Sequence, residues 1–140
     1  MKFWDSSAIV PLLIDEAATD RLSPLPQRDV DMIVWWATPV ECGSAISRRE
    51  RTGDVDASTA VVARERLDAL RARWREVAPS KAVQAAAMRL VRVHALSAAD
   101  ALQLAAALAA SEREDRALDF VCLDGRLAAA AQREGFTIVA

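Results

Sequence analysis

Short apolar runs of strand length alternate with longer stretches of helical character along the whole chain. The strand candidates are residues 2–4, 32–36, 76–79, 120–123 and 137–139. Helix-start residues open the stretches between them, at residues 8–14, 38–53, 56–74, 80–94, 96–111 and 124–134. Residues 23–29, which contain two prolines, are expected to form a loop. Alternating strands and helices favour parallel strand pairing, so the sequence predicts an α/β fold around a mainly parallel sheet.

Composition is consistent with one globular domain covering residues 1–140. Apolar residues make up 53% of the 140 residues and charged residues 27%, which is a globular balance. The formal net charge is -2, so the chain as a whole does not attract nucleic acid. Any contact with RNA must therefore come from a local basic surface.

The two cysteines, Cys42 and Cys122, lie among apolar residues without the spacing of metal ligands, which predicts buried free thiols. The opening residues 1–5 do not have the pattern of a signal peptide. No apolar run reaches the roughly 20 residues of a membrane span. We therefore expect a cytoplasmic protein that does not enter a membrane.

Four carboxylates occupy equivalent places in the predicted fold. Asp5 and Asp124 end predicted strands, and Glu41 and Asp100 lie in the first turns of predicted helices. The carboxyl ends of parallel strands and the starts of the following helices share one edge of the sheet, where ligands bind. The four side chains are therefore expected to converge, although they are far apart in the sequence.

Converging carboxylates repel one another and need a counter-charge. Mg²⁺ and Mn²⁺ prefer oxygen ligands, and two such ions can support phosphodiester hydrolysis by water. A structural alternative stays open, because acids are also common at helix starts. Thr38 with Glu41 and Ser97 with Asp100 have capping-box spacing. Asp5 and Asp124 are also plausible N-caps.

The chain resembles PIN-domain ribonucleases, most closely the VapC-type toxins of bacterial toxin–antitoxin modules. The resemblance covers nearly the whole chain and depends on four segments in a fixed order. They are residues 3–10 (FWDSSAIV), 38–45 (TPVECGSA), 96–107 (LSAADALQLAAA) and 120–128 (FVCLDGRLA). It implies a three-layer fold, with a mainly parallel sheet covered by helices on both faces, and a homodimer.

The resemblance also implies an activity. Asp5, Glu41, Asp100 and Asp124 would form the metal-site acids of a Mg²⁺-dependent endoribonuclease, with Mn²⁺ as a possible substitute. Asp5 and Asp100 would be the direct ligands, and Ser7 a small polar residue beside the metal or the scissile phosphate. Cleavage would leave a 5′-phosphate and a 3′-hydroxyl on structured RNA such as tRNA or rRNA loops. A cognate antitoxin would bind apolar grooves between the N-terminal helices and neutralise the enzyme.

The chain departs from the family pattern at two positions. Cys122 stands where many members have Thr or Ser, and Gln103 stands where many have His. Neither is a metal-site acid, so we expect the chemistry to persist. Two other functions stay open: a Mg²⁺-dependent phosphatase with Asp5 as nucleophile, and a catalytically inert PIN-fold binding scaffold. Ser7 disfavours the phosphatase, because the usual dehalogenase-type pattern needs a second Asp at that position.

Two further groups of residues are less specific. Arg48, Arg49 and Arg51 either reach phosphate oxygens near the acids or form a solvated helix end, and we favour the helix end. Trp35 and Trp36 are adjacent on a predicted strand and must point to opposite faces. We expect one of them in the core and the other beneath a helix.

Overall fold

Five parallel strands form the centre of the molecule in the computed structural model, which describes residues 1–28 and 31–139. The strands are β1 Lys2–Trp4, β2 Met32–Trp35, β3 Arg75–Val77, β4 Asp119–Val121 and β5 Thr137–Val139. Their order in the sheet is β3-β2-β1-β4-β5, and every neighbouring pair is parallel. The predicted parallel sheet is therefore confirmed, with the predicted short strand β3 at one edge.

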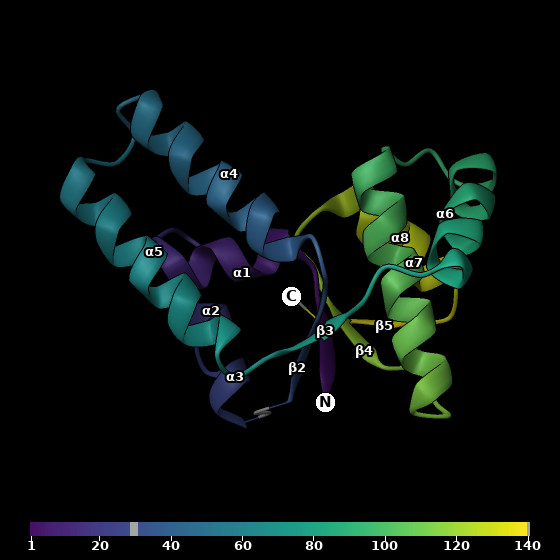
Figure 1. Cartoon of the computed structure of the whole chain (residues 1–140). Coiled ribbons are helices and arrows are strands. Elements are labelled where there is room, and N and C mark those ends of the chain that lie inside the picture. Colours follow the sequence, from purple (N-terminus) through teal and green to yellow (C-terminus); the bar gives the residue numbers. More distant parts are fainter. Residues whose placement is uncertain (29–30, 140) are drawn as a thin grey trace.

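Helices cover both faces of this sheet (Figure 1). They are α1 Ser6–Leu13, α2 Thr19–Leu22, α3 Leu25–Arg28, α4 Thr38–Arg51, α5 Ala57–Arg71, α6 Lys81–Val93, α7 Ala98–Arg113 and α8 Gly125–Arg133. Helices α1, α4 and α5 lie on one side, and α6, α7 and α8 lie on the other. The predicted PIN-like three-layer α/β fold is thus confirmed.

The strand side chains alternate between two separate apolar cores, as the two-residue period of a strand requires. Trp4 and Val34 face α1, α4 and α5, whereas Phe3, Ile33 and Phe120 face α6, α7 and α8. The Phe3 and Phe120 rings, which belong to paired strands, stack with centroids 5.4 Å apart. Both sheet faces are therefore buried, which explains why the strands are continuous apolar runs.

The side of the sheet on which the chain adds strands changes at β1. From β1 the chain adds β2 and then β3 on one side, and it returns to add β4 and β5 on the other. A crevice opens at such a switch point, outside the carboxyl ends of the two central strands. Asp5 follows β1 directly, and Asp124 follows β4 after two intervening residues. The topology alone therefore directs both acids to the usual ligand site of an open parallel sheet.

Three local predictions are corrected. The expected loop at 23–29 contains helix α3, and its residue 29 lies outside the described residues. Trp36 is not beneath a helix, because 54% of it is exposed, while Trp35 is in the core as expected. Strand β4 ends at Val121 and not at residue 123, so Asp124 does not close a strand, whereas its predicted place at the start of a helix is confirmed. No helix within the described residues is long and apolar enough to cross a membrane.

Candidate functional site

All four predicted acids lie on the walls of one cleft at the carboxyl edge of the sheet. The cleft has a volume of about 510 Å³. Asp5 lies between β1 and α1, and Glu41 lies in the first turn of α4. Asp100 lies in the first turn of α7, and Asp124 immediately precedes α8. Ser6, Ser7 and Arg48 also line the cleft. Four segments that are distant in the sequence thus contribute to one surface.

Helix capping explains the positions of Asp5 and Asp124, but Glu41 and Asp100 are not N-caps. Asp5 and Asp124 are true N-caps, because Asp5 Oδ2 accepts from Ser7 N at 3.1 Å and Asp124 Oδ1 from Leu127 N at 3.0 Å. Ser97 caps α7 as predicted, through the backbone N–H of Asp100. A helix-stabilising role therefore exists for Asp5 and Asp124 beside any role in the cleft.

Glu41 does not belong to a capping box. Thr38 was the expected N-cap of α4, but the helix begins one residue earlier and its N-cap is Ala37, which makes no side-chain cap bond. The Glu41 carboxylate bonds with other elements instead. Ser6 Oγ donates to Glu41 Oε2 at 3.0 Å, and Gln103 Nε2 donates to Glu41 Oε1 at 3.1 Å. The carboxylate is therefore held at the junction of α1, α4 and α7.

A hydrogen-bond network ties Asp5 to the segment after β4. The Ser7 hydroxyl donates to Asp5 Oδ2 at 2.5 Å and accepts from Leu123 N at 3.0 Å. The Cys122 thiol donates to the same Asp5 oxygen at 3.7 Å. Asp5 is only 3% exposed. Both Ser7 and Cys122 thus fix the orientation of a nearly buried carboxylate.

Burial and mutual repulsion raise the pKa of three of the acids. Desolvation is the main cause for each of them, because it disfavours the charged form. The negative charge of Asp100 further raises the pKa of Asp5, and Asp124 does the same for Asp100. Asp5 and Asp100 both act on Glu41, against the hydrogen bonds from Ser6 and Gln103. The four carboxyl groups therefore interact electrostatically as one set.

The four carboxylates have no counter-charge of their own within the part of the chain that the structure describes. Among the described residues, no lysine, arginine or histidine forms an ion pair with any of the four carboxylates. Arg48 lines the cleft, whereas Arg49 pairs with Glu16 and Asp54 away from it. The arginine-rich end of α4 is thus divided between a cleft residue and a structural ion pair.

The donor set fits a hydrated divalent ion better than a dehydrated one. In the described part of the chain, no three His, Cys, Asp or Glu side chains are grouped closely enough to hold a metal ion as they stand. Mg²⁺ keeps several waters and commonly uses only one or two carboxylates. The charge of Asp100 raises the pKa of Asp5, and the charge of Asp124 raises the pKa of Asp100, and a hydrated ion in the cleft would relieve this repulsion.

Three site residues were not assigned to the site from the sequence. Ser6 and Thr38 were interpreted only as helix-start residues, and Gln103 only as a departure from the family pattern. Gln103 is fully buried and donates to Thr38 Oγ1 at 3.1 Å as well as to Glu41. A glutamine inside an alanine-rich apolar helix was the available signal, because a buried amide requires polar partners.

Comparisons with known proteins identify no relative of this chain, so the geometry of the cleft is the main evidence about its function. No protein-family model matches the chain, and no curated protein matches it at a significant level.

Proposed function

We propose that the chain is a metal-dependent endoribonuclease of the PIN-domain type. One observation carries this proposal: four carboxylates from four separate segments line a single cleft at the switch point of a parallel sheet, and none of them pairs with a cation of residues 1–28 or 31–139. Such a concentration of negative charge is unfavourable unless a cation is bound. Hard divalent cations with oxygen ligands, Mg²⁺ first and Mn²⁺ as a substitute, match the donor set.

Each acid has a proposed role. Asp5 and Asp100 are the direct metal ligands, and Glu41 and Asp124 complete the negative set that holds ions and their waters. A bound divalent ion supplies Lewis-acid stabilisation of the phosphate and lowers the pKa of a coordinated water. Ser7 holds Asp5 in place through its 2.5 Å hydrogen bond. Arg48 offers a guanidinium to a phosphate oxygen at the open side of the cleft.

The proposed substrate is unpaired RNA. An open cleft at a sheet edge accepts splayed nucleotides, such as those in tRNA or rRNA loops, more readily than a duplex. The resemblance to PIN-domain ribonucleases supports attack by water that leaves a 5′-phosphate and a 3′-hydroxyl. Since the net charge of the chain is -2, attraction to RNA must be local.

The proposed partners are a cognate antitoxin and a second copy of the chain, in the cytoplasm. A hollow of about 320 Å³ lies between α1, α3 and α5, lined by Leu12, Pro26 and Leu70 with Arg66 and Arg73 at its side. This lining suits an amphipathic segment that carries acidic residues. Two buried free cysteines suit a reducing compartment.

Two other functions remain to be separated from this one. A phosphatase with Asp5 as nucleophile is disfavoured, because Ser7 occupies the position of the second acid and bonds to the attacking oxygen. A phospho-aspartyl intermediate on Asp5 would support it. An inert binding scaffold would retain the fold and the cleft without Mg²⁺-dependent cleavage of RNA.

The decisive experiment compares Asp5→Asn with Asp56→Asn. Asp56 is also an N-cap aspartate, but it starts α5 and does not line the cleft. Asparagine preserves capping at both positions. We expect Asp5→Asn to lose at least about 100-fold in Mg²⁺-dependent RNA cleavage, since replacing a residue that only orients a metal ligand already costs roughly 10–100-fold. Asp56→Asn should retain full activity.

The readout is cleavage of structured RNA with and without Mg²⁺, with circular dichroism as a check of the fold. Equal cleavage by wild type and Asp5→Asn would eliminate the metal-site proposal. Absence of cleavage by wild type at every Mg²⁺ and Mn²⁺ concentration would favour the inert scaffold.

A further inference from the structure

An exposed stripe of side chains runs from the end of β2 along α4 into the acidic cleft. It contains an exposed residue at every fourth position: Trp36, Val40, Ser44 and Arg48. Residues at this spacing share a face of a helix, and Val40, Ser44 and Arg48 all line the cleft. Trp36 continues the spacing immediately before the N-cap of α4. The stripe therefore connects an aromatic ring outside the cleft with a cation inside it.

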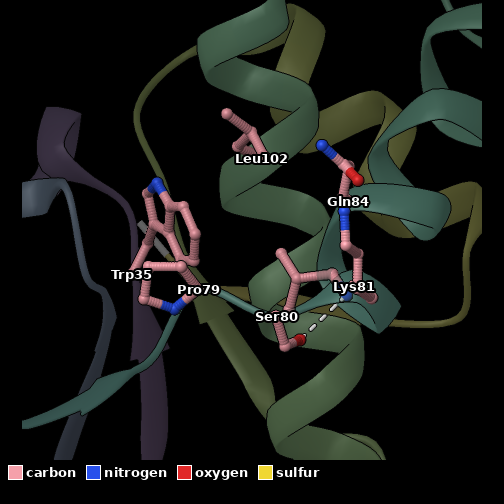
Figure 2. A pocket seen from close by; sticks show the side chains of 7 residues that line it. Trp35, Pro79, Ser80, Lys81, Gln84 and Leu102 are labelled. Carbon is pink, nitrogen blue, oxygen red and sulfur yellow. Dashed lines mark hydrogen bonds between the residues drawn. The ribbon is translucent and has the colours of Figure 1, made fainter.

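The two adjacent tryptophans differ in what they offer to a ligand. Trp35 is 6% exposed and belongs to the core, and Figure 2 shows it beside Pro79 and Leu102. Trp36 is 54% exposed. Its ring packs edge to face against that of Trp35, with centroids 6.5 Å apart, and its backbone N–H donates to Val77 O at 3.1 Å. The core thus holds an exposed aromatic ring in place before any ligand binds.

The register of the sheet places Trp36 beside the metal-site acids. In the pairing of β1 with β2, Phe3 lies opposite Ile33. The same register, continued to the ends of both strands, puts Ser6 opposite Trp36 and directly after Asp5. Paired strands lie about 4.8 Å apart. Trp36 therefore leaves the sheet at the same edge as Asp5, one strand away from it.

We propose that Trp36 stacks on an unpaired base of the RNA substrate, next to the phosphate that enters the cleft. The proposal rests on the proposed function, because it assigns a subsite of the same substrate. Exposed aromatic rings bind unpaired bases of any sequence by stacking. From this base, the RNA backbone would follow the stripe past Val40 and Ser44 to the guanidinium of Arg48.

The composition of the stripe fits a nucleotide chain better than another protein. Single exposed apolar residues are normal on protein surfaces, so the exposure of Trp36 alone does not define a binding site. Here the apolar pair Trp36 and Val40 is followed by the hydroxyl of Ser44 and the guanidinium of Arg48. Within residues 1–28 and 31–139, Arg48 forms no ion pair. A nucleotide chain supplies both a flat base and phosphate oxygens, whereas an apolar protein segment would leave this cation unpaired.

The fluorescence of Trp36 provides a direct test of stacking. The other three tryptophans, Trp4, Trp35 and Trp74, are buried, so a base at the surface quenches mainly Trp36. Wild type is titrated in EDTA at low salt, without cleavage, with a short oligouridine and with a ribose-phosphate oligomer of equal length that has no bases. Oligouridine should quench the indole fluorescence as it binds, and the oligomer without bases should not.

Three variants of Trp36 separate stacking from simple apolar contact. Their affinities are measured by anisotropy with fluorescein-labelled forms of both oligomers. Trp36→Ala and Trp36→Leu should weaken binding of oligouridine about fivefold or more, the lower end of the losses seen when a stacking ring is removed. Trp36→Phe keeps a ring and should retain most of the affinity. None of the three should weaken binding of the oligomer without bases.

Met88→Ala is the matched control for loss of an exposed apolar side chain. Met88 is 65% exposed on α6 and does not line the cleft. This variant should keep both the affinity and the quenching of wild type. Circular dichroism checks that all variants fold, which is expected because Trp36 and Met88 lie outside the two apolar cores.

Several outcomes overturn the proposal. They are no binding of oligouridine by wild type, binding without quenching, wild-type affinity of Trp36→Ala or Trp36→Leu, and equal weakening of both oligomers. A change in oligomeric state of Trp36→Ala with RNA affinity retained would assign Trp36 to an interface between two copies of the chain. Failure of the proposed function is visible separately, as oligouridine that binds with quenching and is not cleaved when Mg²⁺ is added.

Discussion

At the residue scale, Gln103 explains how Glu41 is held without a cation. Its amide nitrogen donates to both Thr38 Oγ1 and Glu41 Oε1, each at 3.1 Å. Its amide oxygen is buried and has no partner among the described residues. A buried polar atom without a partner costs about 1–3 kcal/mol. The amide nitrogen must face Glu41 to donate to its carboxylate. The amide oxygen therefore points away from Glu41 and has no partner.

Replacing Gln103 tests this positioning role. Gln103→Leu removes the unpaired oxygen and also the donor to Glu41 and to the buried Thr38 Oγ1, so the two effects oppose each other and stability should fall by no more than about 3 kcal/mol. The RNA-cleavage rate should fall about tenfold or more, since a hydrogen bond to a charged group contributes about 1.5–3 kcal/mol. Gln132→Leu, on the exposed side of α8, is the matched control and should keep wild-type activity. Wild-type cleavage by Gln103→Leu would contradict the role.

At the element scale, helix starts set the positions of the acids. Asp5 and Asp124 cap the helices that follow them, and Ser97 caps the helix that carries Asp100. A cap fixes the first turn of its helix, because it satisfies an N–H group that otherwise has no partner. The same local signals that start the helices therefore also place the carboxylates at the sheet edge.

The cap of α7 provides a test that does not require catalysis. Ser97→Ala removes the acceptor of the Asp100 backbone N–H and should lower the free energy of unfolding by about 1 kcal/mol. Loosening this turn should also weaken Mn²⁺ binding, measured by calorimetry. Asp56→Ala removes the cap of α5, away from the cleft, and should lower stability without changing Mn²⁺ affinity. Equal Mn²⁺ affinity in wild type, Ser97→Ala and Asp56→Ala would show that Asp100 is not part of the metal site.

At the scale of the whole molecule, the cleft joins the two helical layers. Asp5 and Glu41 belong to the side of α1 and α4, and Asp100 and Asp124 belong to the side of α7 and α8. Repulsion across the cleft acts against the packing of the layers. A divalent ion between them would therefore stabilise the entire fold, not only the site.

The raised pKa values predict how this stabilisation depends on pH. Asp5, Glu41 and Asp100 each bind their proton more tightly in the folded state than at the usual carboxyl pKa values of 3.8 and 4.5. Their contribution to stability is complete below those values and is lost as the pH rises through the raised folded-state pKa values. In the absence of metal, these three groups therefore make the protein less stable near neutral pH.

Metal addition should reverse that loss. An ion at about 100 times its Kd stabilises the folded state by about 2.7 kcal/mol, or on the order of 10 °C in Tm. We expect Mg²⁺ or Mn²⁺ to raise Tm near neutral pH and to have no effect below pH 3.8, where Asp5, Glu41 and Asp100 are protonated. Calorimetry of wild type with Asp5→Asn as comparator checks this. A shift of equal size at both pH values, or in both proteins, would point to binding elsewhere.

Much of this molecule follows from local patterns in the sequence. The apolar runs gave the strands within one or two residues, and the helices of α4 to α8 begin close to their predicted starts. The helix-start signal at Thr38 placed the N-cap of α4 one residue too late. The prolines at 24 and 26 predicted a loop where α3 forms. Boundary residues are less certain because neighbouring turns, and not the pattern alone, decide where a helix begins.

The sequence by itself determined the parallel α/β sheet and the edge at which the acids must lie, because strand period, helix starts and chain direction are local properties. Only the tertiary structure decided the contacts across the cleft. Ser6 and Gln103 both donate hydrogen bonds to Glu41, although they lie 35 and 62 residues from it in the sequence. The exposure of Trp36 was equally undetermined by the sequence. Such contacts depend on how whole helices pack on the sheet, which no short segment of the chain encodes.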